Sequence, residues 1–222
     1  MQIIRLEIGC KNALKQKEFY SDILGLEIFN STATSFELHL GYSQLFFQEN
    51  KDFTPYHIAF HIPNKSENQA LSWLQQRLSI LPFENNDIID FPAWKAKSIY
   101  FYDADLNIME FISRKDLNGF LTEDFSDSSI LGISEIGLAT TNIEEKFRFL
   151  KENCGLKVYD GNFEKFCAIG EDQGLFITIN SANKTWFPTG DFAYNSTFNI
   201  KIVHNNKEYK LQYNRNKLSM LQ

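Results

Sequence analysis

The feature that most constrains this chain is an internal repeat of a strand followed by a helix. With Arg5, His57 and Glu135 taken as equivalent positions, an Asn stands seven residues further on in each segment and a large apolar residue fourteen further on. A Gly-Leu pair also recurs at the same offset from Arg5 and from Glu135, at 25–26 and 155–156. Matching offsets of this kind indicate duplicated structural units.

Each unit is expected to be a strand, a helix and then short strands. In the second unit, His57, Ala59 and His61 alternate with apolar residues over 57–62, the period of a half-buried strand. A helix-like run follows at 67–78, and residues 98–112 alternate around the turn-forming segment 103–107, which predicts a hairpin. The fold class is therefore α+β, built from tandem βαβββ units.

The spacing predicts two domains. Residues 1–52 and 53–115 hold the first two units, a polar and acidic linker spans 116–129, and 130–222 holds a third unit and an incomplete fourth. An incomplete unit leaves a sheet edge unpaired, which favours docking on the first domain or a homodimer.

Composition excludes some classes of function. The net charge is −6 and the basic residues are dispersed, so nucleic acid is not an expected partner. No apolar run reaches membrane-spanning length, and the chain opens on a strand with no signal peptide before it. Three scattered cysteines suggest reduced thiols in the cytoplasm. The 21 Phe and 9 Tyr indicate either a ring-lined cavity or simply a Phe-rich core.

His57 and Glu110 are the leading candidates for a site. If Ile58 and Phe60 pack under the helix of their unit, the side chains of His57 and Glu110 emerge together on the open face of the sheet. A His and a carboxylate on adjacent strands are half of a metal site, although a buried ion pair or two unrelated polar residues are alternatives. His61 shares the face of His57 and could add a nitrogen or only line the bowl.

Three segments together resemble the vicinal oxygen chelate superfamily, namely residues 18–26, 57–60 and 100–111, and residues 135–142 resemble another opening strand of that family. The superfamily includes glyoxalase I, extradiol dioxygenases, fosfomycin-modifying enzymes and bleomycin-resistance proteins. The resemblance implies paired units that curl into a bowl around a divalent metal ion, Fe, Mn, Ni or Zn. It also implies metal ligands on the opening strand of each unit and a Glu on the closing strand.

Carried over by position, the resemblance implies His57 and Glu110 as metal ligands, with Glu135 as a candidate in the second domain. The first unit departs from the pattern, because Arg5 stands at the opening position and Gln48 or Phe46 at the closing one. Arg5 would repel a metal ion and attract Glu110, so Arg5 and Gln48 are instead expected to bind a small ligand. Tyr100 and Tyr102 are expected on the bowl face as catalytic groups, or only as packing.

These residues leave two main functions open. One is a metal-dependent lyase or dioxygenase that acts on a small oxygen-chelating substrate. The alternative is a metal-free protein of the bleomycin-resistance type that binds a small anionic or aromatic ligand. A partner-binding scaffold on a decayed enzyme fold is a third, less specific possibility.

Overall fold

The computed structural model describes residues 1–117 and 124–221 of the chain. The first two units contain β1 (Gln2–Cys10), α1 (Ala13–Glu18), β2 (Ile28–Phe29), β3 (Ser35–Leu40) and β4 (Ser43–Glu49), then β5 (His57–Ile62), α2 (Glu67–Gln75), β6 (Ile89–Phe91), β7 (Ala96–Tyr102) and β8 (Ile108–Arg114). The third contains β9 (Gly132–Thr140), α3 (Ile143–Cys154), β10 (Val158–Gly161), β11 (Phe166–Glu171) and β12 (Gly174–Asn180). The strands β13 (Phe198–His204), β14 (Lys207–Asn214) and β15 (Lys217–Met220) follow without a helix in residues 198–221, all of which are described. The predicted α+β class with βαβββ units is confirmed.

The recurring Asn of the repeat begins a helix in two of the units. The side chain of Asn12 accepts a hydrogen bond from the backbone N–H of Lys15, and Asn142 accepts one from Glu145. An N-cap oxygen satisfies a backbone donor that the helix itself leaves free. At the other end of α3, Gly155 takes a left-handed conformation with φ of 73°, which a residue without a Cβ adopts at little cost.

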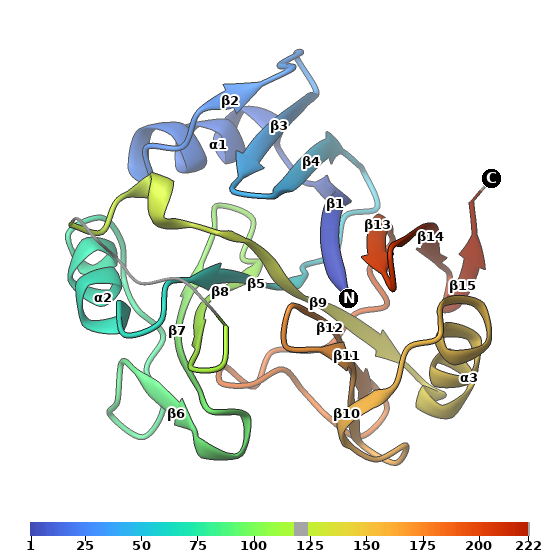
Figure 1. Cartoon of the computed structure of the whole chain (residues 1–222). Helices are drawn as coiled ribbons and strands as arrows, with labels where there is room; N and C mark the ends of the chain where they lie inside the picture. The colour runs from blue at the N-terminus through green and yellow to red at the C-terminus, as the bar shows by residue number, and fades with distance from the viewer. Residues whose placement is uncertain (118–123, 222) are drawn as a thin grey trace.

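Each complete unit forms its own part of the sheet in the same way. The closing strand lies parallel to the opening strand, so that β4 pairs with β1, β8 with β5 and β12 with β9. The helices α1, α2 and α3 lie around the outside of the strands (Figure 1). Curved sheets with outer helices were predicted, and the structure has this arrangement.

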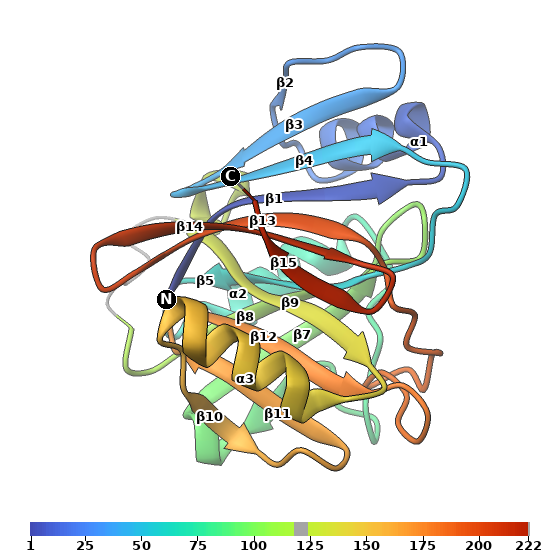
Figure 2. The ribbon, with the colours of Figure 1, turned by 90° about the vertical axis from the view of Figure 1, so that its right-hand side faces the viewer.

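The units pair differently from the expectation that the first two share a domain. The opening strand β5 lies antiparallel to β9, and β1 lies antiparallel to β13. Unit two therefore faces unit three, and unit one faces the last three strands (Figure 2). The physical reason is that the free edge of each opening strand must be covered, and the nearest strand in sequence need not be the one that covers it. A boundary at 116–129 stays a prediction, and its residues 118–123 lie outside the described part of the chain.

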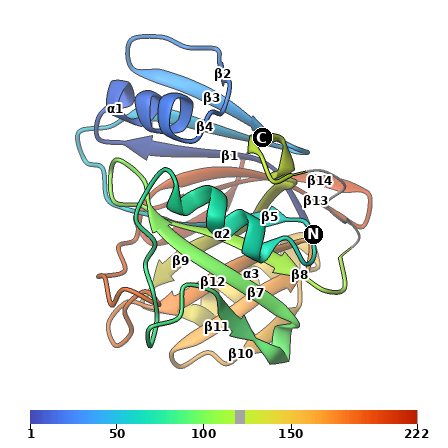
Figure 3. The ribbon, with the colours of Figure 1, turned by 90° about the vertical axis from the view of Figure 1, so that its left-hand side faces the viewer.

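The convex side of the second unit holds the core predicted for it. Ile58, Phe60, Met109 and Phe111 are fully buried, and the ring of Trp73 on α2 lies 6.2 Å from that of Phe111. The helix α2 runs across these strands in Figure 3. Because side chains alternate along a strand, burial of these residues turns His57 and Glu110 to the concave side.

Two further findings concern membranes and thiols. Among the described residues, no helix has the length and apolar character needed to cross a membrane. Cys10, Cys154 and Cys167 are all buried and free, without a disulfide in the described part of the chain.

Candidate functional site

A cavity of about 290 Å³ lies on the concave side of the sheet, where unit two meets unit three. His57, Glu110 and Glu135 line it together. The register of the strands explains why. Ala59 on β5 is paired with Glu110 on β8 and with Glu135 on β9. The small side chain of Ala59 therefore lies between two carboxylate-bearing strands, and both carboxylates reach the same space.

Aromatic rings form much of the cavity wall. The rings belong to Phe91, Trp94, Tyr100, Phe166, Trp186 and Phe187. They come from β6, β7 and the turn between these strands, from β11 and from the segment that leads from β12 to β13. A small apolar pocket with a few convergent polar groups is the usual form of a small-molecule site.

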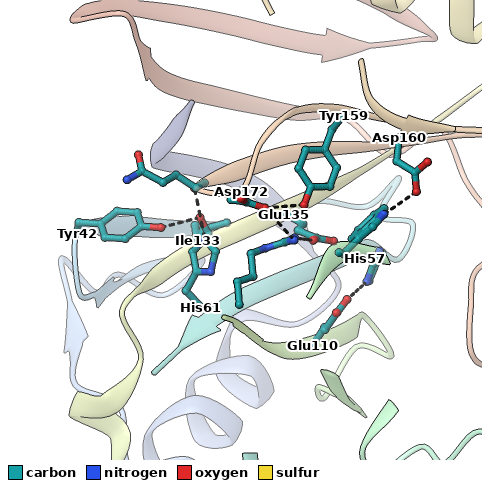
Figure 4. Close-up of polar contacts among 12 residues, drawn as sticks. Tyr42, His57, His61, Glu110, Ile133, Glu135, Tyr159, Asp160 and Asp172 are labelled. Carbon is teal, nitrogen blue, oxygen red and sulfur yellow. Dashed lines mark hydrogen bonds and ion pairs between the residues drawn. The ribbon is translucent and has the colours of Figure 1, made fainter. Parts of the chain in front are cut away.

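His57 and Glu110 form a buried pair at this cavity. Nε2 of His57 lies 2.9 Å from Oε2 of Glu110, and their side chains are 6% and 2% exposed (Figure 4). The imidazole lies against the indole of Trp186, with 5.1 Å between ring centroids. Its Nδ1 is buried and has no hydrogen-bond partner among the described residues. The second nitrogen therefore has no competing protein contact there.

Glu135 forms an ion pair with Arg114, the last residue of β8. Both side chains are almost completely buried, at 3% and 1% exposure. Burial and, after it, the negative charge of Glu110 raise the pKa of Glu135, and Arg114 opposes both effects, so that the pKa is about 7. The site thus holds two close carboxylates that are only partly neutralised.

Tyr100 and Tyr102 have separate surroundings. Tyr100 is fully buried in the cavity wall, and burial together with the charges of Glu110 and Glu135 raises its pKa well above the usual value. The hydroxyl of Tyr102 donates to Asp191 and so ties β7 to the segment that carries Trp186. Tyr100 is therefore a neutral hydrogen-bond donor at the cavity, whereas Tyr102 holds part of its border.

His61 is two residues from His57 but lies deeper in the structure. Its Nε2 lies 3.4 Å from the carbonyl oxygen of Gln173. Burial, and secondarily the positive charge of Arg114, lower the pKa of His61 to about 3. The side chain is a buried neutral imidazole held by backbone, beyond the residues that line the cavity.

Arg5 and Gln48 lie on the other half of the sheet. The guanidinium of Arg5 contacts Glu7 and Glu37, at 2.7 Å each, and Gln44 at 3.0 Å. The expectation that Arg5 pairs with Glu110 is wrong, because β1 pairs with β4 and β13 rather than with β5. Gln48 donates to the carbonyl of Thr34 and borders a different hollow between β1, β4 and β13.

Three residues of the site were not foreseen from the sequence. Arg114 shares the strand face of Glu110 by the period of two, a signal that was available. Trp186 belongs to the aromatic segment at 185–189, whose place depends on the tertiary fold. Lys184, the residue before that segment, lines the cavity with its Nζ 5.1 Å from the ring centroid of Phe166.

The donor chemistry of the cavity suits a divalent metal ion. One imidazole and two carboxylates match the preferences of first-row divalent metals, and the Nδ1 of His57 lacks a partner in the described structure. In the described arrangement, however, no three His, Cys, Asp or Glu side chains are grouped as ligands. The reason is visible in the contacts, since Glu110 is bonded to His57 and Glu135 to Arg114. A complete ligand set would require Glu135 to leave Arg114.

Comparison with known proteins identifies the relatives of this chain. It is 35% identical over 116 residues to metallothiol transferase FosB of Staphylococcus haemolyticus (strain JCSC1435), a match that covers 49% of this chain and 80% of the relative. FosB of Staphylococcus epidermidis is also 35% identical over 116 residues, with the same coverage. No family model matches the chain.

A solved structure extends the similarity in fold over most of the chain. It is a dioxygenase-like protein of Bacillus subtilis subsp. subtilis str. 168, with a TM-score of 0.58 at 14% identity. The match covers 81% of this chain and 63% of the other, so this chain spans less than two thirds of that protein. The repeated βαβββ units, the parallel closing strands and the FosB relatives agree, and this chain belongs to the vicinal oxygen chelate superfamily.

Proposed function

We propose that this chain is a metal-dependent enzyme of the lyase or dioxygenase class that acts on a small oxygen-chelating substrate in the aromatic cavity. The observation that carries the proposal is the convergence of His57, Glu110 and Glu135 from two paired units on one cavity. The name of the relatives, metallothiol transferase, supports metal dependence and makes transfer of a thiol a third reaction to test.

His57, Glu110 and Glu135 would hold the ion, with Fe, Mn, Ni and Zn as candidates. A bound divalent ion supplies Lewis-acid stabilisation of negative charge that develops on substrate oxygens. The contacts of the protein's own residues then define the remaining roles. Tyr100 stays protonated because its pKa is raised by burial and, in part, by a hydrogen bond to Glu110. Its hydroxyl would donate to a substrate oxygen only by exchanging that bond.

The walls of the cavity suggest the shape of the substrate. Aromatic rings such as those of Trp94 and Trp186 line the cavity and suit a flat or apolar portion of a ligand. Lys184 at the cavity adds a positive charge that would favour an anionic group on the ligand.

Metal content tests the proposal. We expect protein purified without chelator to contain about one metal ion per chain by mass spectrometry, and His57→Ala to lose it. His39→Ala is the matched control, because His39 lies on β3, away from the cavity, with a side chain 42% exposed. The metal-dependent function would be contradicted if wild-type protein bound none of Fe, Mn, Ni and Zn when they are added back.

The alternative function is metal-free binding of a small anionic or aromatic ligand. The Arg114–Glu135 ion pair favours it, because an internal cation already neutralises one carboxylate of the site. We expect such ligands to raise the melting temperature in the presence of EDTA if this alternative holds. A shift that appears only with added metal would reject it.

A cytoplasmic location and a homodimer complete the proposed function. Free, buried cysteines are consistent with a reducing compartment. The dimer is proposed because members of a symmetric assembly cover exposed sheet edges. Sedimentation of the full chain tests it, and a single monomeric species at micromolar concentration would contradict it.

A further inference from the structure

The Arg114–Glu135 ion pair is the feature of the site that metal binding does not explain. Arg114 is 1% exposed, and its Nη2 donates to Oε1 of Glu135. A guanidinium is a permanent cation with no lone pair to offer a metal. Arg114 therefore pairs with Glu135, one of the three side chains that the proposed metal site requires.

We propose that Arg114 competes with the metal ion for Glu135, so that this ion pair sets how tightly the site binds metal. The inference rests on the proposed metal-dependent function and names the residue that regulates it. Two cations close to one buried carboxylate repel each other. A bound metal ion must then weaken the contact between Arg114 and Glu135. That contact must weaken metal binding by the same factor, because the coupling is reciprocal.

Asp172 is a second carboxylate with which Arg114 can form an ion pair. Oδ1 of Asp172 lies 3.7 Å from Nη1 of Arg114, and the same oxygen accepts a hydrogen bond from the hydroxyl of Tyr159 at 2.6 Å (Figure 4). Nε and Nη1 of Arg114 are buried and have no hydrogen-bond partner in the described residues. These donors are available for a closer contact with Asp172 once Glu135 has left.

Two rings keep the guanidinium in place during such an exchange. The guanidinium carbon of Arg114 lies 5.5 Å from the ring centroid of Trp94 and 5.9 Å from that of Tyr159. Contacts of a cation with ring faces do not depend on which carboxylate it pairs with. Release of Glu135 therefore does not leave a buried, unpaired charge, the outcome that would otherwise prevent it.

The test measures dissociation constants of Mn²⁺, Ni²⁺ and Zn²⁺ for the full chain by titration calorimetry. We expect Arg114→Gln to bind metal at least tenfold more tightly than wild type, because the competing cation is gone and the amide can still donate to Glu135. We expect Asp172→Asn to bind at least threefold more weakly, because Arg114 then has only Glu135. Circular dichroism and a melting curve check the fold of each variant.

Matched controls separate competition from a general change of charge. Asp160→Asn removes a nearby carboxylate that accepts from the indole of Trp94, so it should change affinity by less than twofold. Arg148→Gln breaks an exposed ion pair with Glu144 and should leave the affinity for metal unchanged. If Arg114→Gln does not fold, the comparison of Asp172→Asn with Asp160→Asn still tests the competition, because only Asp172→Asn should weaken metal binding and equal affinities would overturn the proposal.

Each outcome can be assigned. Equal or weaker metal binding by folded Arg114→Gln, with wild type binding metal, overturns the competition and leaves the metal site standing. Unchanged affinity in Glu135→Gln also overturns it, since Glu135 is then not a ligand. Metal bound by Arg114→Gln but refused by wild type supports the competition and, at the same time, rejects the metal-dependent function of the wild-type chain. Refusal by both overturns it together with the metal-dependent function.

Discussion

Gly137 packs against the indole of Trp186, and a Cβ at this position would overlap that ring. A Cβ at position 137 would stand 2.7 Å from Cη2 of Trp186 and 3.1 Å from Cβ of His57. The first distance is far inside van der Waals contact, so the ring would have to move. A missing side chain on β9 thus determines how the cavity is closed over the imidazole.

Substitution of Gly137 is expected to open the cavity. Gly137→Ala should displace Trp186 from His57, lower the free energy of unfolding by about 1–3 kcal/mol and shift the Trp fluorescence. Gly9→Ala on β1 is the control, because its nearest neighbours would be at an ordinary 3.4 Å. Urea unfolding measures both variants, and equal stability of the two would contradict the packing argument.

Asp103 is expected to be a strong contributor to stability. Its carboxylate accepts hydrogen bonds from the side chains of Gln16 and Tyr20 on the first helical segment, and from both the backbone and side chain of Asn107. Asp103→Asn places an NH₂ group against these donors and should cost about 2–3 kcal/mol. Asp116→Asn, in an exposed ion pair with Lys95, should cost less than about 0.5 kcal/mol. Thermal and urea unfolding would compare them.

The buried, neutral side chain of His61 is expected to make the folded chain less stable in mild acid. Its pKa is about 3 in the folded chain against an ordinary 6.5, so below pH 6.5 the unfolded chain takes up a proton that the folded chain refuses. Stability is full above pH 6.5 and falls as the pH drops toward 3. Between pH 7 and 5.5 the loss from this residue should be about 1.2 kcal/mol. His61→Gln should lack that part of the decrease, and an identical pH dependence in both proteins would refute the assignment.

Tyr102 is expected to control the segment between β12 and β13. Its hydroxyl donates to Asp191, and the backbone of Trp186 donates to the carbonyl of the same residue. Tyr102→Phe removes one side-chain hydrogen bond, worth about 1 kcal/mol. We expect faster proteolysis within residues 181–197 with little change in melting temperature. A cleavage rate equal to that of wild type would show that the contact does not restrain the segment.

Local periodicity was sufficient to predict much of the fold and part of the site. Alternation along 57–62 and 108–112 correctly placed His57 and Glu110 on one concave face, because the facing of a strand residue depends on its immediate neighbours. The recurring Asn indicated duplicated units, and in two of them it caps the helix, α1 and α3.

The choice of paired units could not be predicted in this way. Whether β5 pairs with β4, β9 or β13 at its free edge depends on the relative stability of contacts between segments that are distant in sequence. The alternation of side chains along one strand carries no information about these contacts. That choice brings Glu135 to Glu110 and takes Arg5 away from both. The neighbours of Arg114 depend on the same choice, since Glu135 and Asp172 belong to unit three.

The pairing of β1 with β13 also has a consequence for synthesis of the chain. Leu6 is paired with Ile200, so this edge of the first strand has no partner until Ile200 has left the ribosome. Such distant contacts slow folding, and an uncovered strand edge can pair with another chain in the meantime. The pairing of β5 with β9 needs no residue beyond Thr140 and can form earlier, although the cavity is complete only once Trp186 and Phe187 have emerged. During synthesis, the half that bears Arg5 thus keeps an uncovered strand edge longer than the half that bears His57.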